Sequence, residues 1–134
     1  LLGGLQALTA GTVDGPRPAV MVMDAYLLRA IAVAGYAPNL SECSRCGADG
    51  PHEAFSPVMG GLVCRRCRPP GSALIAPETI AYLGALGVGD WAATREIGAA
   101  TIRQGSGVVT AFLSWQLERG LRSLRHLDRA AAGA

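Results

Sequence analysis

The residues of this chain best suited to chemistry are four cysteines in two pairs. The segments "CSRC" and "CRRC" place Cys43 with Cys46 and Cys64 with Cys67, with seventeen residues between the pairs. This spacing lies within the range of four-cysteine zinc sites. Two residues between ligands let the backbone turn so that both thiolates reach one ion at about 2.3 Å. The pattern predicts one zinc ion held by all four cysteines.

Other uses of paired cysteines fit the sequence less well. Disulfides within each pair would close tight, strained loops, and a thioredoxin-like redox pair needs a strand–helix–strand context that is absent here. An iron–sulfur cluster stays open as an alternative. Four thiolates complete a tetrahedron and leave no open position for catalysis. We therefore interpret the zinc as structural, and His52, between the pairs, as a surface side chain.

The segment that carries the cysteines differs from the rest of the chain. Between residues 36 and 72, Gly, Pro and Cys are frequent and no helical period is visible. The stretch "HEAFSPVMGGLVC" predicts two short strands, near residues 53–56 and 62–64, with a turn at 59–61. Gly47 is expected to take the positive φ that the first ligand turn needs. We predict a small module with a β-hairpin between its ligand pairs.

Helical patterns flank this segment on both sides. We expect a helix ending near residue 10, one from Pro18 to about residue 34, one beginning at Pro77, a short one over about 92–104 and a long last one over about 106–130. The fold class is therefore mainly α, with the four-cysteine module inserted into a helical domain. The predicted division is 1–35 and 73–134 for the helical part and 36–72 for the module.

Each helix has a predicted apolar face. For the helix after Pro18 the face is Val20, Met23, Leu27, Ile31 and Ala34, widened by Tyr26, Leu28 and Val33, so that most sides should be buried. For the helix after Pro77 it is Ile80, Leu83, Ala85 and Leu86. For the last helix it is Val109, Phe112, Leu113, Leu117, Leu121 and Leu124.

Composition narrows the functional class. The formal net charge is +2, and the apolar run at 19–35, interrupted by Asp24 and Arg29, is short for a bilayer span. No secretory signal is visible, so we expect a cytoplasmic, nucleoid-associated protein without a membrane. The missing initiating Met and the helical spacing of leucines at the start indicate a fragment of a longer protein. No nucleophile elbow, P-loop or dinucleotide fingerprint occurs, which argues against an enzyme.

Arginine supplies all twelve basic residues. One group adjoins the second cysteine pair and consists of Arg65, Arg66 and Arg68. Another group lies along the last predicted helix and consists of Arg119, Arg122, Arg125 and Arg129. Guanidinium groups suit phosphates or the carboxylates of an acidic partner. The plainer alternative is a solvated helix face supported by pairing of Glu118 with Arg122. We retain the first six as candidate DNA- or partner-binding residues.

Several stretches resemble a known family. "DAYLLRAIAVAGYAPNLSECSRCG", "AFSPVMGGLVCRRCRPPGS" and "PETIAYLGAL" are similar to the C-terminal part of the bacterial DNA repair family RecO, and "SWQLERGLRSLR" resembles its last long helix. The resemblance covers nearly the whole chain. It implies zinc ligands at Cys43, Cys46, Cys64 and Cys67, in a module similar to the zinc finger of ArfGAP proteins.

The resemblance also implies a function. Members of the family are non-enzymatic recombination mediators of the RecF pathway that act with RecR, help load RecA onto strands coated by the single-strand-binding protein SSB, and anneal complementary strands. Their N-terminal OB-fold, which binds single- and double-stranded DNA, is not predicted within these residues. The helical domain is linked to docking of the acidic SSB tail, for which Arg119, Arg122 and Arg125 are candidates.

Two other functions start from the zinc module alone. An ArfGAP-like regulator would supply a catalytic arginine, Arg66 or Arg68, to a GTPase. A stand-alone zinc ribbon would read bases with Arg65 and Arg66. The long apolar helices around the module favour the scaffold interpretation over both.

Overall fold

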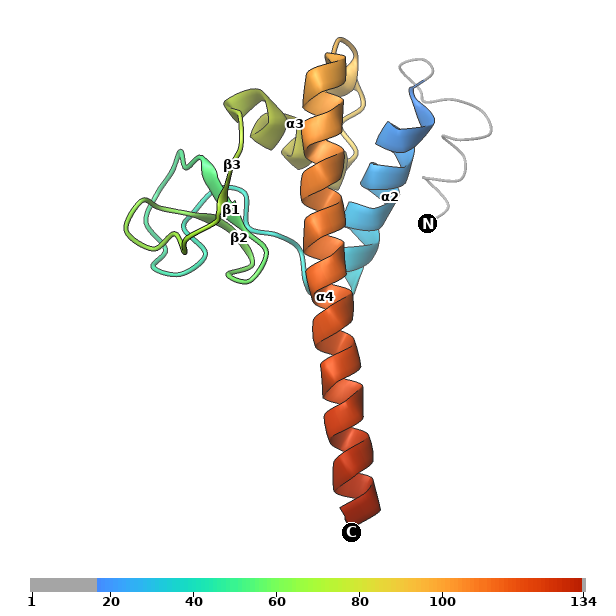
Figure 1. Ribbon diagram of the computed structural model, residues 1–134. Helices are drawn as coiled ribbons and strands as arrows, with labels where there is room; N and C mark the ends of the chain where they lie inside the picture. The colour runs from blue at the N-terminus through green and yellow to red at the C-terminus, as the bar shows by residue number, and fades with distance from the viewer. Residues whose placement is uncertain (1–16, 134) are drawn as a thin grey trace.

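The computed structural model describes residues 17–133, with side chains to residue 125, and consists of helices around one small sheet. Its elements in chain order are α2 (Ala19–Val33), β1 (Ala54–Ser56), β2 (Gly61–Val63), β3 (Ala73–Leu74), α3 (Pro77–Val88), the 3-10 turn η1 (Ala92–Thr94) and α4 (Ala99–Gly133). Figure 1 shows the sheet on one side of α4 and α2 on the other. The predicted class, a mainly α domain with a small β module, is confirmed. The helix expected before residue 10 lies outside the described residues.

The sheet is antiparallel, with strand order β2-β1-β3. The hairpin of β1 and β2 lies where the sequence predicts it, with Phe55 opposite Leu62. Strand β3, which pairs with the other edge of β1 and places Ala73 opposite Phe55, is not among the predicted strands. Two exposed residues have too weak a pattern to predict a strand. The sheet therefore continues past residue 72, where we expected the helical part to resume.

The buried side of α2 differs from the predicted one. Its buried residues are Met21, Val22, Asp24, Ala25, Leu28 and Ile31. Of the five residues predicted to form the face, Ile31 alone is buried, whereas Val20 and Met23 are 44% and 46% exposed. Val33 is 90% exposed, so the expectation that most sides are buried is also wrong. Because α2 is apolar almost all round, helical spacing could not select the side that meets the core.

Helix α3 follows the prediction more closely. It begins at Pro77, as expected, and ends at Val88, followed by Gly89, whose φ of 73° is the left-handed conformation typical of the residue after a helix. Leu83 and Leu86 are buried, and Ile80 and Ala85 are partly buried. The sequence analysis missed Thr79 and Tyr82, which are also buried. Together with α2 and α4, this helix encloses the main core.

Helix α4 is one continuous helix, so the predicted separation between a short helix ending at 104 and a long one starting at 106 is wrong. Glycines at 105 and 107 lower the local helix propensity. Gly105 is instead required by packing, since a Cβ there would lie 2.8 Å from Cε2 of the buried Tyr82 ring. Tertiary contact with α3 thus overrides the local preference.

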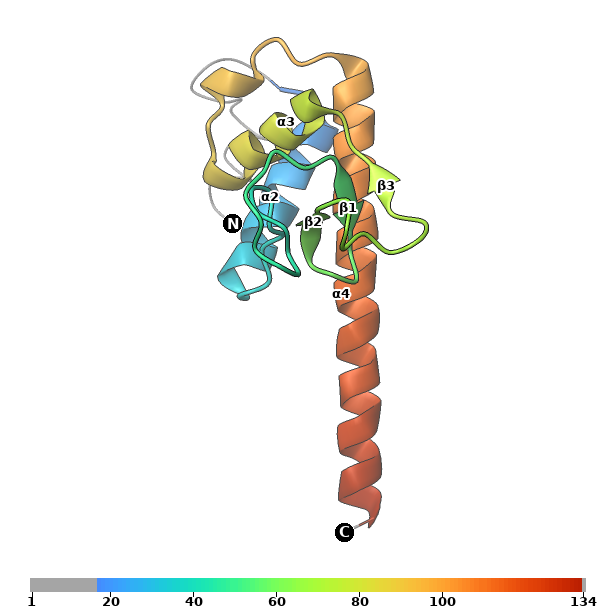
Figure 2. The ribbon, with the colours of Figure 1, turned by 90° about the vertical axis from the view of Figure 1, so that its left-hand side faces the viewer.

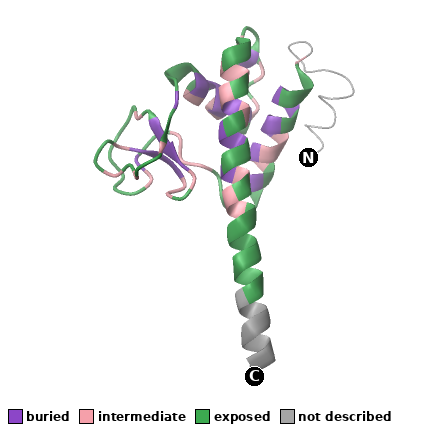
Figure 3. Cartoon of the chain, in the orientation of Figure 1, coloured by how far each residue is buried: buried purple, intermediate pink, exposed green. Residues whose placement is uncertain are grey.

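The apolar stripe of α4 is covered along only part of its length. Val109 and Phe112 are buried, but Leu117, Leu121 and Leu124 are 61%, 55% and 58% exposed. Figure 3 shows α4 as exposed from the point where it leaves the core to the start of its grey end, and Figure 2 shows the helix projecting from the core in a second direction of view. The leucine pattern therefore predicted the helix correctly. It did not predict that, among the described residues, nothing buries the last three leucines of the stripe.

One carboxyl group lies inside the helical core. Asp24 on α2 is 4% exposed, and its Oδ2 has no hydrogen-bond partner, as is also true of the Tyr82 hydroxyl from α3. Burial raises the pKa of Asp24, and a hydrogen bond with Ser106 of α4 opposes this. Burial and the charge of Asp24 raise the pKa of Tyr82 to about 12. The three helices therefore meet around a carboxyl whose pKa is raised by burial.

We expect Gly105→Ala to lower the free energy of unfolding by about 1–3 kcal/mol, because the added methyl group would press on the enclosed Tyr82 ring. Gly107→Ala is the matched control: no atom lies within 4 Å of its built Cβ, so the better helix former should raise stability by up to about 1 kcal/mol. Thermal unfolding followed by circular dichroism measures both. Equal effects would contradict the packing role of Gly105.

We expect Asp24→Asn to raise stability at neutral pH by roughly 1 kcal/mol, because the folded state no longer holds an ionised carboxyl away from water. The folded-state pKa is raised, so the neutral carboxyl is favourable at low pH and this contribution is lost as pH rises through that pKa. The advantage of the variant should therefore disappear as pH falls toward the ordinary value of 3.8. Unfolding curves measured across pH test whether the stability difference between the variant and the wild type shrinks as pH falls. Asp49→Asn, at an exposed position, is the control.

Candidate metal centre and arginine surfaces

Each cysteine pair is shaped by a tight backbone turn. Cys43 and Gly47 are joined by a 2.9 Å hydrogen bond from the Gly47 N–H to the Cys43 carbonyl, and Gly47 has the predicted positive φ, 77°. In the second turn, the N–H groups of Cys67 and Arg68 both donate to the Cys64 carbonyl. The N–H of Ser44 donates to the Leu62 carbonyl on β2. The hairpin thus brings the two turns together.

The four sulfur atoms occupy one small volume. Every Sγ of Cys43, Cys46, Cys64 and Cys67 lies within 4.8 Å of the others, and the Cys46–Cys64 distance is 3.8 Å. A tetrahedron with metal–sulfur bonds of 2.3 Å has edges of about 3.8 Å. All four cysteines are free, and the distance between the Cys46 and Cys64 sulfurs is well beyond the length of a disulfide bond. The arrangement therefore suits a single metal ion.

The pKa values of the thiols indicate whether the cluster can hold four thiolates without a metal ion. Backbone N–H groups of Cys46 and Cys64 lower the pKa of the Cys43 thiol to about 5. The pKa of Cys64 is lowered by the N–H of Cys67, while a hydrogen bond with Cys64 raises the pKa of Cys67 to about 12. Four adjacent thiolates repel one another, so the protein groups alone stabilise only part of the charge. A divalent cation would let all four ionise.

The module has little apolar material of its own around the sulfurs. Its separate buried cluster consists of Cys43, Ala54 and Val63, with Met59, Cys64 and Cys67 partly buried against it. His52 is not part of the cysteine cluster, and its Nε2 lies 2.8 Å from the Ala48 carbonyl as a hydrogen-bond partner. This geometry fits the expectation that His52 is not a ligand.

The arginines near the second cysteine pair are all exposed, and they lie in different surroundings. Arg65 and Arg68 line a cavity of about 460 Å³ between the module and α3, whose floor includes Leu40 and Ile80. Arg66 lies outside this lining. The structure thus divides a cluster that is continuous in the sequence.

The arginines of α4 also lie in different surroundings. Arg119 lines a groove of about 420 Å³ between α2 and α4, together with Leu27, Ile31, Tyr36 and Leu117. Arg122 lies over the ring of Trp115, 5.0 Å from its centroid, and Arg125 is exposed. The side chain of Arg129 lies outside the described residues.

The sequence analysis missed Trp115 and the groove, because both depend on the relative position of residues on neighbouring turns and helices. An i,i+7 aromatic–arginine spacing on the last helix was the available signal. The expected pairing of Glu118 with Arg122 is not formed among the side chains that the structure describes.

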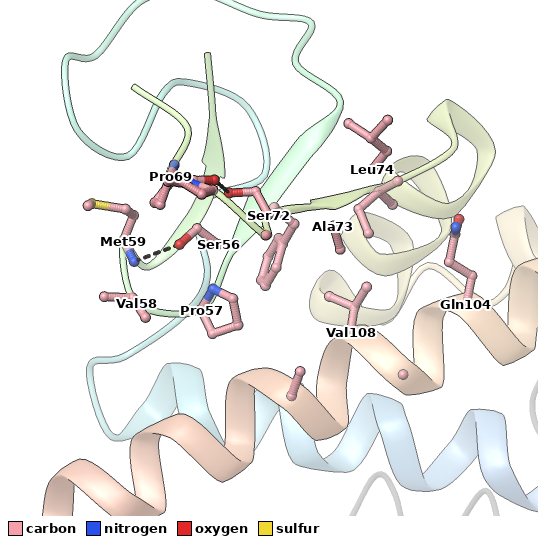
Figure 4. Close-up of a pocket in the computed structure, with 16 residues that line it drawn as sticks. Ser56, Pro57, Val58, Met59, Pro69, Ser72, Ala73, Leu74, Gln104 and Val108 are labelled. Carbon is pink, nitrogen blue, oxygen red and sulfur yellow. Dashed lines mark hydrogen bonds between the residues drawn. The ribbon is translucent and has the colours of Figure 1, made fainter. Parts of the chain in front are cut away.

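A cavity of about 680 Å³ lies between the sheet and α4 (Figure 4). Pro57, Val58 and Leu74 contribute apolar surface from the module, and Val108 contributes from α4. The hydroxyl of Ser56 accepts a hydrogen bond from the Met59 N–H, and that of Ser72 donates to the Pro69 carbonyl. No charged residue lines the cavity. It therefore offers no obvious contact to phosphate.

Within residues 17–133, none of the helices combines the length and apolar character that crossing a bilayer requires.

Comparison with known proteins places the chain in a family. The family model described as "Recombination protein O C terminal" matches residues 1–125. A protein named "DNA repair protein RecO" from Cutibacterium acnes is 55% identical over 129 residues, covering 96% of this chain and 52% of the relative. Proteins of the same name from Nocardioides and Thermobifida fusca are 50% and 48% identical, covering 96% and 97% of this chain and 52% of each relative.

No solved structure matches the chain. The chain spans about half the length of the curated relatives that it matches. Since the family model covers nearly all of it, the chain belongs to the RecO family and corresponds to the C-terminal part of those proteins.

Proposed function

We propose that this chain is the zinc-stabilised scaffold of a non-enzymatic recombination mediator in DNA repair. Its relatives are named as DNA repair proteins, and the observation that carries the proposal is the four-cysteine cluster set into a chain that the family model matches. In this proposal the scaffold supports DNA binding and strand annealing, and contacts RecR and SSB. The division at residues 36 and 72 is part of the same proposal.

Zinc is proposed as the metal, with Cys43, Cys46, Cys64 and Cys67 as its ligands. The sulfur spacing and the partial ionisation of the thiols support a divalent, thiophilic ion. The separate buried cluster of the module is small, so metal binding would supply folding free energy that the apolar core cannot. The helices have their own core and do not depend on the ion in this way.

We expect one zinc per chain, thiols that react only after chelation, and helical circular dichroism that survives metal removal. Cys64→Ser should weaken zinc binding by about a hundredfold or more. Losing a ligand should lower the affinity by more than losing a group that only hydrogen-bonds to a ligand, which typically costs about 10–100-fold. His52→Ala is the control and should leave zinc affinity unchanged. Metal analysis with a competing chelator measures both variants. Iron with acid-labile sulfide, or two disulfides, would contradict the zinc assignment.

The groove between α2 and α4 supports the proposed contact with the acidic tail of SSB. Its lining is mostly apolar and includes Arg119, and no acidic side chain lines it among the residues that the structure describes. An acidic peptide with apolar residues could bury those residues against Leu27 and Ile31 and pair a carboxylate with Arg119. Arg122 and Arg125 are not among the lining residues, so in this proposal Arg119 matters most.

We expect Arg119→Glu to weaken binding of the SSB tail peptide by about tenfold, because the variant reverses the charge at the groove. Arg103→Glu is the matched control: Arg103 is an exposed arginine on the same helix and lies outside the groove lining. Isothermal titration calorimetry with the zinc-loaded chain measures both. Equal losses of peptide affinity in the two variants would show that the peptide does not bind in the groove. If the wild-type chain bound neither the SSB tail nor RecR, the scaffold function itself would be refuted.

A further inference from the structure

The projecting half of α4 has an aromatic side chain surrounded by arginines. Trp115 is half-buried, with the Arg122 guanidinium over its ring at 5.0 Å from the centroid. At about 100° per residue, Arg119 and Arg122 flank Trp115 on one side of the helix, and Arg125 follows Arg122 near the edge of that side. We call these four residues the Trp115 face. All three arginines are exposed.

The exposed leucines lie on another side of the same helix. Leu117 and Leu124 are each about half a turn away from Trp115 around the helix axis, and Leu121 lies beside them. A surface that covered these leucines would leave the Trp115 face accessible. The two sides can therefore have different ligands.

We propose that the Trp115 face binds single-stranded nucleic acid, with a base stacked on the Trp115 indole and phosphates contacted by Arg122, Arg119 and Arg125. This deepens the proposed function and rests on it, because it assigns part of the DNA binding to this chain. Indole rings accept any base by stacking, and arginine both stacks and binds phosphate. Arg122 can leave the ring for a neighbouring phosphate when a base takes its place.

Charge complementarity favours an anionic ligand for this surface. Three arginines surround Trp115, and Glu118 is the one acidic residue between residues 115 and 125. Arg119 and Arg125 lie about 9 Å apart along the axis, at 1.5 Å per residue, which spans more than one phosphate of a strand. No ion pair ties Arg122 to Glu118 among the described side chains, so its guanidinium is available to phosphate.

The partly exposed indole of Trp115 distinguishes a nucleic-acid strand from an acidic peptide as the ligand of this surface. An acidic peptide needs the arginines but gains little from the indole, whereas unpaired bases use both. Bases in a duplex are already stacked on one another. The Trp115 face should therefore prefer a single strand to a duplex of equal length.

The test is a titration of the zinc-loaded chain with fluorescein-labelled oligo(dT), followed by anisotropy. Trp115→Ala should weaken binding about tenfold, and Trp115→Phe, which keeps a ring, should recover most of the affinity. Arg122→Ala should reduce the slope of log affinity against log salt by about one. In a Trp91→Phe background, the fluorescence of Trp115 should be quenched on binding, as direct contact with a base requires.

A gain of affinity provides a test that loss of folding cannot imitate. Glu118→Gln removes the one carboxylate of the surface and should strengthen oligo(dT) binding several-fold. Arg103→Ala removes the same charge as Arg122→Ala from an exposed position on another side of α4 and should leave the affinity nearly unchanged. Circular dichroism shows that each variant remains folded.

The proposal is overturned if oligo(dT) fails to bind or to quench Trp115, if Trp115→Ala binds as the wild type does, or if Arg103→Ala weakens binding as much as Arg122→Ala. Quenching of Trp115 by the SSB tail peptide, but not by oligo(dT), would assign the face to a protein partner instead. The two proposals fail separately. Binding of RecR or SSB without oligo(dT) would leave the scaffold intact and refute the Trp115 face.

Discussion

The packing of Phe55 against Phe112 joins the two parts of this molecule. The rings meet edge to face, with centroids 6.1 Å apart, at the point where β1 faces α4. Phe55 and Leu62, which are opposite each other in the hairpin, both belong to the main helical core. Ala54 and Val63, their neighbours in the strands, belong to the small cluster with Cys43. Alternation along two three-residue strands thus connects the helices on one side and the sulfurs on the other.

This arrangement places the cysteine cluster and the helical core on opposite sides of the same hairpin. If the cluster holds zinc as proposed, loss of the ion would remove the restraint on the cysteine turns, but the side of the hairpin that includes Phe55 would keep its apolar contacts. The large cavity beside Phe55 is also part of this junction, because the sheet and α4 approach each other without filling the space between them. The module is therefore anchored along one line of contacts, with its cysteine turns away from α4.

The parts of the fold that the sequence predicts correctly are those with a strong local signal. The cysteine spacing located the cluster, the Gly-rich turn located the hairpin, and Pro77 located the start of α3. The failures required knowledge of tertiary contacts: which side of an apolar helix meets the core, as with Val20 and Met23, and whether Gly105 interrupts α4 or admits Tyr82. The arginines illustrate the same limit. Arg119 and Arg122 are close in sequence and both belong to the Trp115 face, but only Arg119 also lines the groove, because α2 reaches it and does not reach Arg122.

Helix α4 is where these surfaces come together. Its N-terminal half is held by the core, so the C-terminal half is a continuation whose direction is fixed by Val109 and Phe112. An isolated helix of this length in water gains little from its own hydrogen bonds, and its leucines gain nothing while exposed. Exposed apolar stripes of this kind are typical of interaction surfaces. The helix therefore presents leucines on one side and Trp115 with Arg122 on another, and the groove beside α2 borders both, because Leu117 and Arg119 line it. A change at Arg119 affects both the groove and the Trp115 face, whereas Arg122 lies outside the groove lining and tests the Trp115 face alone.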